Sequence, residues 1–353
     1  MPTPFPALLN RLDPQDVFGS VQRFARQGRQ AVADLRTLKF PKLRGKVDAI
    51  VLAGMGGSAL GAHIIQTACS QELRVPLVIV NDYTLPAWVG RRTLVILASY
   101  SGTTEETLTA WPHAKKSGAK IAVIAAGGNL GRIARSNKLP AYIFNPIENP
   151  SKQPRLGLGY AVFGLLGMLR KMGLLDITPN AIEEALEVAS RTVRRTDLRS
   201  GTSPIVKLTA SLKGRAVYVV AAEHLVGAAH AMSNQLNETA KTVATYFAIP
   251  ELNHHLMEGL GNPKQNVRRT TFLFLQSSLY SPRIQKRFRL TAEVVQKNGA
   301  KVLPVRLTSR TRLSQAIEAL VLGGALTLGL GLRYHVNPAE IWWVNYFKKK
   351  LGK

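Results

Sequence analysis

The sequence contains a single cysteine, Cys69, in 353 residues. One thiol cannot close an internal disulfide, which excludes a small secreted scaffold held by disulfides and zinc fingers built on several cysteines. Acidic residues are also scarce: 21 Asp and Glu stand against 47 Lys and Arg, a formal net charge of +26. Such a charge favours anionic partners, including nucleic acid and phosphorylated small molecules. The basic residues are scattered, with no long basic tail and no basic run interleaved with aromatics, so we expect no specific nucleic acid partner.

Long apolar runs are lacking as well. The apolar, Gly-rich runs at 156–169 and 319–332 are too short to cross a bilayer, so we interpret them as buried helices and expect no membrane partner. The first twenty residues do not have the cationic start and apolar run of a signal peptide, which leads us to expect a cytoplasmic protein. With 46% hydrophobic and 19% charged residues, the composition is globular, and the length suits two domains.

Short apolar runs alternate with helical stretches, and the alternation occurs twice. The runs of the first half are 49–53, 77–80, 94–98, 121–125 and 141–144. Continuous apolar strands separated by helices are typical of a parallel sheet covered on both faces. In the second half, 216–220 matches the first run, 271–275 the third and 302–305 the fourth. The predicted fold class is therefore α/β, with two similar domains, each a parallel sheet flanked by helices on both faces.

The domain boundaries are predicted from the segments between the strands. Residues 182–195 have a helical pattern that bridges the two halves, and the turn-forming segment 200–204 follows it. Phe18, Val21, Phe24 and Ala25 have helical spacing near the N-terminus. We predict a helical lead-in at 1–40, a first domain with the bridging helix at 41–198, and a second domain with a C-terminal tail at 199–353.

Two loops carry candidate chemistry, because ligands of parallel sheets bind at the carboxyl ends of the strands. The first is the Gly-rich turn 54–58, which exposes backbone N–H groups at a helix start. Gly54, Gly56 and Ala59, with Asp82 after the next strand, also fit a dinucleotide fingerprint loosely, which leaves a dinucleotide-dependent oxidoreductase as an alternative.

The second loop follows the third predicted strand and reads Ser-Tyr-Ser-Gly-Thr-Thr-Glu-Glu-Thr from residue 99. Its hydroxyls, together with helix-terminal amides, can cradle a phosphate monoester. The alternative is a capping box in which Ser101 or Thr103 pairs with Glu106, although capping accounts for only one of the hydroxyls.

Together, the two loops resemble the sugar isomerase (SIS) domain. The segments 153–155, 234–241 and 250–254 further resemble the bifunctional phosphoglucose/phosphomannose isomerases, in the right order from about residue 47 onward. The resemblance implies two SIS-type domains and the interconversion of glucose 6-phosphate and fructose 6-phosphate through a cis-enediolate, with no cofactor and no metal. Ala339 stands where the family commonly has a threonine tied to the mannose epimer, so mannose 6-phosphate is the less firmly implied substrate.

The resemblance also implies roles for single residues. Glu238 matches the base that moves a proton between C2 and C1, and Arg155 matches the arginine that stabilises the enediolate. His254 matches a histidine that assists ring opening from a neighbouring subunit, which implies a homodimer. Lys348 matches an active-site lysine, with the register among Lys348, Lys349 and Lys350 left open. The residues implied to bind the 6-phosphate are Gly56, Gly57, Ser58, Ser99, Ser101 and Thr104.

Each of these roles has a plainer alternative. Glu238 could be an exposed helix glutamate paired with Lys241. Arg155 could hold a structural carboxylate, and Lys348 could be one charge of a C-terminal helix. His254 could be structural; its neighbour His255 suggests a metal site, but no third ligand is apparent. For the whole protein, a sugar-phosphate-binding regulator without catalysis remains the main alternative.

Overall fold

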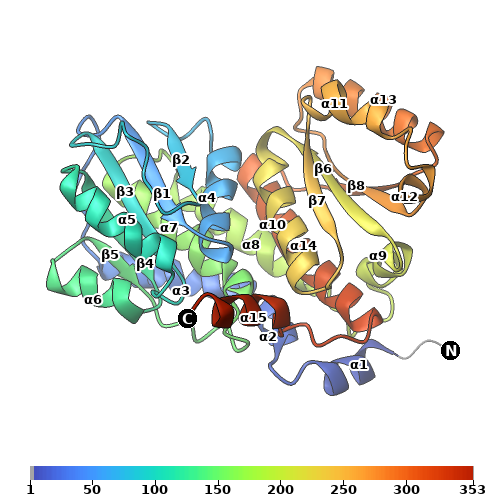
Figure 1. Cartoon of the computed structure of the whole chain (residues 1–353), viewed down its shortest axis with the longest axis horizontal. Helices are drawn as coiled ribbons and strands as arrows, with labels where there is room; N and C mark the ends of the chain where they lie inside the picture. The colour runs from blue at the N-terminus through green and yellow to red at the C-terminus, as the bar shows by residue number, and fades with distance from the viewer. Residues whose placement is uncertain (1–3, 353) are drawn as a thin grey trace.

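The computed structural model describes residues 4–352 and contains two parallel sheets side by side (Figure 1). Residues 1–3 of the predicted lead-in and residue 353 of the predicted tail lie outside the described residues. The first sheet has the order β2-β1-β3-β4-β5. Its strands are β1 (Ala49–Gly54), β2 (Leu77–Val80), β3 (Thr93–Ser99), β4 (Lys120–Ala125) and β5 (Ala141–Ile143). All five strands that the sequence predicted for the first half are confirmed.

The second sheet has the order β7-β6-β8-β9. Its strands are β6 (Ala216–Ala222), β7 (Ala244–Ile249), β8 (Thr270–Ser277) and β9 (Lys301–Leu307). The order matches β2-β1-β3-β4 of the first sheet, so the predicted correspondence of 216–220, 271–275 and 302–305 to the first, third and fourth strands is confirmed. The strand β7 was not among the predictions.

A shared layer of apolar helices lies between the two sheets (Figure 1). Its members are α4 (Gly57–Ala68), α7 (Leu158–Met172), α10 (Val226–Glu238) and α14 (Arg312–Arg333). Within residues 4–352, α14 alone is long and apolar enough to cross a membrane, and it is buried in the core. The burial of α7 and α14 confirms the interpretation of the Gly-rich runs as core helices.

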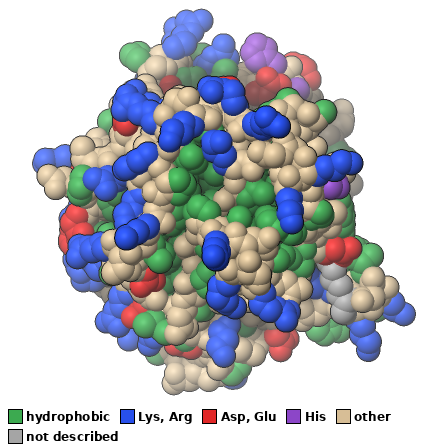
Figure 2. Space-filling model, turned by 90° about the vertical axis from the view of Figure 1, so that its left-hand side faces the viewer, with side chains coloured by type: hydrophobic (Ala, Val, Ile, Leu, Met, Phe, Trp, Pro, Cys, Tyr) green, Lys and Arg blue, Asp and Glu red, His purple; other side chains and the backbone are tan. Residues whose placement is uncertain are grey.

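The outer faces of the two sheets are covered unequally. In the first domain, α5 (Glu105–Lys116) and α6 (Gly128–Ser136) pack over an outer core. Figure 2 looks onto this side of the molecule, where apolar side chains gather at the centre and Lys and Arg side chains surround them. The second domain has α13 (Pro282–Lys297) in the place of α5, but the chain passes from β9 directly to α14, without counterparts of α6 and β5.

The remaining helices surround these two units. They are α1 (Phe5–Leu12), α2 (Val17–Gln22), α3 (Phe24–Thr37), η1 (Pro154–Leu156), α8 (Pro179–Arg195), α9 (Pro204–Leu212), η2 (Glu223–Leu225), α11 (Leu252–Gly259), α12 (Lys264–Arg268) and α15 (Trp342–Lys350). The helix α3 packs on α7 and α8, whereas α1 and α2 of the predicted lead-in contact α14 of the second half. The helix α15 has no buried residue.

Candidate active site

The loop after β3 gathers three of the hydroxyls implied to bind phosphate. Ser99 Oγ lies 2.7 Å from Thr104 Oγ1 and 3.4 Å from Ser101 Oγ, and it accepts a hydrogen bond from the Gly102 N–H at 3.0 Å. Ser101 Oγ in turn accepts from the backbone N–H of Thr103 at 3.2 Å. The result is a compact polar turn at the carboxyl end of the first sheet, where a ligand is expected.

The capping alternative for this loop is wrong. The helix α5 begins at Glu105, its N-cap is Thr104, and no side chain forms the capping hydrogen bond. Ser101 and Thr103 lie before the cap and bond to each other, with Thr103 Oγ1 donating to Ser101 Oγ at 2.9 Å. The hydroxyls are therefore turned into the loop rather than onto the helix end.

The Gly-rich turn joins this loop to Arg155. Ser58, near the start of α4, accepts a hydrogen bond from the Tyr100 N–H at 2.8 Å. A Cβ atom on Gly57 would lie 2.7 Å from the carbonyl carbon of Pro154 and 2.8 Å from the Arg155 nitrogen, so only glycine allows this approach of α4 to η1. The loop that carries Ser99, Ser101 and Thr104, which we call the hydroxyl loop, and Arg155 are thus fixed relative to each other within the first domain.

Arg155 is 1% exposed, and each nitrogen of its guanidinium group donates to at least one acceptor. Its Nε donates to Thr239 Oγ1 at 3.0 Å, and Nη2 donates to the carbonyl oxygens of Pro338 and Ala339 at 2.8 and 2.9 Å. Its Nη1 donates to Gln153 Oε1 at 3.0 Å and contacts a carboxylate oxygen of Glu238 at 3.5 Å. One cation therefore ties the first domain to α10 and to the C-terminal tail.

Glu238 is the last residue of α10, and its side chain is 34% exposed. The carboxylate faces Arg155 rather than Lys241, so the predicted alternative of a Glu238–Lys241 side-chain pair is wrong. Lys241 Nζ instead donates to the main-chain carbonyl of Glu238 at 2.6 Å and to that of Glu340. Arg155 does meet a carboxylate, as its own alternative proposed, but that carboxylate is the candidate base.

Desolvation acts on both cations next to Glu238. Burial lowers the pKa of the Arg155 guanidinium, and the Glu238 carboxylate opposes that shift. Loss of water around the Lys241 ammonium, together with the nearby Arg155 charge, lowers the pKa of Lys241 to about 8. The Glu238 carboxylate therefore faces a guanidinium group that is almost fully buried, a setting that strengthens their electrostatic interaction.

The cavities behind these groups are small. The space beside Arg155 and the space behind Ser58 and Ser99 each measure about 20 Å³. Such a volume holds a single water molecule at most. A ligand as large as a sugar phosphate would therefore have room only on the solvent side of Glu238 and the hydroxyl loop.

His254 and Lys348 form no hydrogen bond or ion pair with Arg155 or Glu238 within the described residues. His254 lies in the first turn of α11, is exposed, and follows the carboxyl end of β7, whereas Glu238 precedes the amino end of that strand. A strand rises about 3.3 Å per residue, so the length of β7 separates the two side chains. Lys348 is exposed on α15, as are Lys349 and Lys350.

No group of three His, Cys, Asp or Glu side chains suited to a metal ion occurs within residues 4–352. His255, the neighbour of His254, instead has its ring 6.0 Å from that of Phe247. The polar groups of the candidate site are instead the neutral hydroxyls of the loop after β3 and the fixed guanidinium group of Arg155.

Sequence reasoning missed two residues of the site. Thr239 is fully buried and accepts a hydrogen bond from Arg155 Nε, and Lys241 Nζ donates a hydrogen bond to the main-chain carbonyl oxygen of Glu238. Both lie directly after Glu238, in the segment 234–241 that resembles the family, and this position in the sequence could have indicated a role. The lowered pKa of Lys241 could not be predicted, because it arises from burial and from Arg155, which is distant in the sequence.

The fold and this loop define a protein of the SIS class. The family model described as the bacterial phosphoglucose isomerase C-terminal SIS domain matches residues 202–351. A bifunctional phosphoglucose/phosphomannose isomerase of Caldicellulosiruptor bescii is 31% identical over an alignment of 318 residues, and the match covers 87% of this chain and 90% of that relative. One of the same name from Thermoplasma volcanium is 29% identical, over 87% and 93% of the two chains. The chain belongs to the bifunctional phosphoglucose/phosphomannose isomerase family.

Solved structures support the same fold. A hypothetical protein from Thermus thermophilus superposes with a TM-score of 0.71 at 17% identity, covering 98% of this chain and 93% of the other. At that identity the likeness concerns the arrangement of the two sheets and their helices alone.

Proposed function

We propose that this protein interconverts glucose 6-phosphate and fructose 6-phosphate, with Glu238 as the base. The observation that carries the proposal is the meeting of Glu238 and Arg155, 3.5 Å apart and contributed by different domains, in a chain of this family. The hydroxyl loop of Ser99, Ser101 and Thr104, joined to Arg155 through Ser58 and Gly57, supports binding of the 6-phosphate in the first domain.

The chemistry is an internal redox exchange between two carbons. After the sugar ring opens, the Glu238 carboxylate takes the proton from C2, and the C2–H electron pair forms the C1–C2 double bond of a cis-enediol(ate). The protonated carboxyl group then returns the proton to C1, and the C2–O–H electrons form the ketone. The proton that leaves the C2 oxygen is balanced by one gained at the C1 oxygen, which becomes a hydroxyl group. No net electrons leave the sugar, which is why the proposal needs no cofactor.

Arg155 would contribute a fixed positive charge where the enediolate oxygen develops. Its Nη1 contacts a carboxylate oxygen of Glu238 at 3.5 Å. When Glu238 takes the proton, the attraction between the two groups would fall, and the same N–H would be available to the enediolate oxygen without a movement of the guanidinium group. Charge would thus move from carboxylate to substrate beside an unmoving cation.

The remaining roles extend this proposal. His254 would assist ring opening in the site of a second copy, because it lies beyond the length of β7 from its own Glu238. Lys348 would enter the site by a movement of the exposed helix α15. Both roles, the homodimer that the first requires, and a cytoplasmic location are part of the proposal.

The test is isomerisation of fructose 6-phosphate by the purified protein, with EDTA and without nucleotide. We expect glucose 6-phosphate to form, and separate detection of mannose 6-phosphate decides whether Ala339 permits the second epimer. Glu238→Gln should lower kcat by roughly 10²–10⁴-fold with KM nearly unchanged, as expected for loss of a general base. Glu184→Gln, on α8 outside the site, is the matched control. Substantial turnover by Glu238→Gln would refute the base, and binding without turnover by the wild type would favour a sugar-phosphate-binding regulator.

A further inference from the structure

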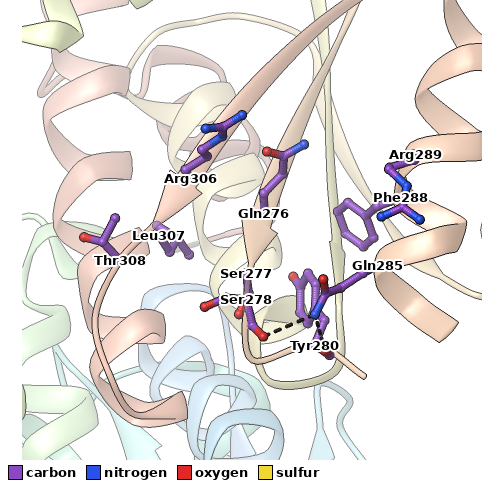
Figure 3. A pocket seen from close by; sticks show the side chains of 10 residues that line it. All are labelled: Gln276, Ser277, Ser278, Tyr280, Gln285, Phe288, Arg289, Arg306, Leu307 and Thr308. Carbon is purple, nitrogen blue, oxygen red and sulfur yellow. Dashed lines mark hydrogen bonds between the residues drawn. The ribbon is translucent and has the colours of Figure 1, made fainter. Parts of the chain in front are cut away.

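A second hollow, remote from Glu238, opens in the second domain between α13 and the ends of β8 and β9 (Figure 3). Its volume is about 620 Å³. We call it the β9 hollow and define it by Gln276, Ser278, Gln285, Phe288, Arg289 and Arg306. In Figure 3, Arg306 and Gln276 come from the strands, and Arg289, Phe288 and Gln285 face them from the helix.

The β9 hollow lies at the counterpart of the hydroxyl loop. In the first domain, Ser99 of β3 pairs with Ala125 of β4. Ser99 lies six residues after Thr93, where β3 begins, and Ala125 lies five residues after Lys120, where β4 begins. In the second domain, Gln276 of β8 pairs with Arg306 of β9, six and five residues into strands that begin at Thr270 and Lys301. The strand orders match, so these two pairs occupy equivalent places at the carboxyl ends of the two sheets.

The hollow exists because the second domain lacks α6. In the first domain, α6 follows β4, and its Leu130 and Ala134 pack into the outer core together with Val123 and Ala125. The equivalent residues of β9 are Pro304 and Arg306, and both are exposed. The surface that is apolar in the first domain, where α6 covers it, is therefore polar at the equivalent place in the second domain. A helix packed there would bury a polar group, which is unfavourable.

The charge of the hollow is of one sign. No acidic residue lines it, and neither the Arg289 nor the Arg306 side chain has a hydrogen bond or an ion pair within residues 4–352. The two guanidinium groups belong to opposite walls, one on α13 and one on β9. Arginine forks match the oxygens of a phosphate group.

The helix-side wall is held in place by its own hydrogen bonds. Gln285 Nε2 donates to the carbonyl oxygens of Ser278 and Tyr280 at 3.2 and 2.8 Å, which fixes the loop after β8 against α13 (Figure 3). The buried ring of Phe288 supplies an apolar surface between the polar groups. Fixed walls, one apolar surface and a few converging polar groups are the usual features of a small-molecule site, and 620 Å³ is within the usual range of volumes.

We propose that the β9 hollow is a second binding site, separate from the catalytic one, for a phosphorylated sugar. The phosphate group would contact Arg306 and Arg289, and the sugar hydroxyls would contact Gln276 and Ser278. The volume is larger than a phosphate ion needs and suits a hexose phosphate. The site goes beyond the isomerisation proposed above, because none of its residues belongs to the catalytic set.

The experiment counts bound ligands per chain by equilibrium dialysis. Two probes are used, fructose 6-phosphate measured as total hexose phosphate, and inorganic phosphate. We expect two hexose phosphates per chain of the wild type and one for Arg306→Gln and for Arg289→Gln, with the lost site weakened roughly tenfold or more. The loop variant Ser101→Ala/Thr104→Ala should keep the second site and lose the catalytic one. If inorganic phosphate binds more weakly than fructose 6-phosphate at the site that depends on Arg306, the sugar is part of the ligand that the site recognises.

Lys286→Gln is the matched control, since it removes one positive charge from α13 outside the hollow. It should retain two sites. Binding that is unchanged in both arginine variants, whether the wild type binds one hexose phosphate or two, would overturn the proposal. An equal loss in Lys286→Gln would overturn it too, because it would reveal non-specific attraction. One site in the wild type that is lost in the arginine variants would keep this proposal and count against binding at the catalytic site. Burial of the hollow between two copies, with no ligand bound there, would assign it to a protein partner instead. Loss of isomerase turnover alone would affect only the function proposed for Glu238.

Discussion

At the scale of single residues, Gly57 fixes the distance between the helix that follows the Gly-rich turn and the segment that carries Arg155. Its missing side chain leaves room for the Pro154 carbonyl, 2.7 Å from where a Cβ would lie. We expect Gly57→Ala to push α4 from η1, to destabilise the fold by about 1–3 kcal/mol, and to lower kcat more than tenfold. Gly201→Ala is the control, because nothing lies within 4 Å of its added Cβ. Urea unfolding and turnover are measured on both; equal behaviour of the two variants would show that the close approach has no role.

Lys241 gives a second prediction at this scale, in the alkaline range. Its pKa is lowered from 10.5 to about 8, chiefly by desolvation. Between these values the unfolded chain keeps a proton that the folded chain has released, so the free energy of unfolding should rise as pH increases from about 8 to 10.5. Lys241→Met should remove this part of the rise, and Lys286→Met should retain it. The measurement is urea unfolding at several values in this range; an unchanged profile for Lys241→Met would contradict it.

The clustering of the candidate hydroxyls was predictable from the sequence because it is local. The hydroxyls of Ser99, Ser101 and Thr104 lie in one short turn, and the turn brings them together whatever surrounds it. Lys241 and Thr239 act through Arg155, which is more than eighty residues away, so no local pattern shows their roles. Likewise, the coverage of Arg155 by the carbonyls of Pro338 and Ala339 depends on the tertiary fold.

At the scale of elements, two histidines lie where α4 meets α10. The rings of His63 and His230 are 4.5 Å apart, and His63 Nε2 and His230 Nδ1 are buried with no hydrogen-bond partner among residues 4–352. Burial, with a contribution from His230, lowers the pKa of His63 to about 4 from 6.5. The unfolded chain therefore binds a proton that the folded chain excludes, and the free energy of unfolding falls as pH drops from about 6.5 to 4.

We expect His63→Phe to remove part of this acid sensitivity. The pH-dependent difference from the wild type should be on the order of 1 kcal/mol, because the residual contact of His63 with solvent weakens the effect. His113→Phe, on the exposed side of α5, is the control. Unfolding by urea is followed at about pH 7.5, 5.5 and 4.5, values that span the range over which the histidine titrates. Identical slopes for the wild type and His63→Phe would exclude this helix contact as the source.

The elements themselves were predictable where the sequence has a short apolar run. The five strands of the first sheet and three of the second contain such runs, and so do α7 and α14, although the burial of β9 is interrupted at Pro304 and Arg306. The strand β7 was missed although residues 246–249 are apolar; it is an edge strand, and five of its six residues are at least partly exposed.

At the scale of the whole molecule, the C-terminal segment after α14 has two parts that differ in their contribution to stability. Residues 338 and 339 supply acceptors to the buried Arg155, whereas α15 buries nothing. A chain ending at residue 340 should unfold within about 0.5 kcal/mol of the full chain. One ending at 337 should lose roughly 3–5 kcal/mol, since it leaves two N–H groups of a buried cation unpaired. Urea unfolding of the two shortened chains compares them directly, and equal stability would contradict this division.

The Arg155 contacts also bear on how the chain matures as it is synthesised. The arginine emerges early, but its acceptors on the tail follow 183 and 184 residues later. At about 5–20 residues per second, translation leaves that cation without these partners for roughly 10–40 s. The first domain can therefore collapse around its sheet while Arg155 stays hydrated, and the site is completed only when the end of the chain arrives. A nascent chain stalled before Pro338 would hold a folded sheet and an unfinished catalytic centre.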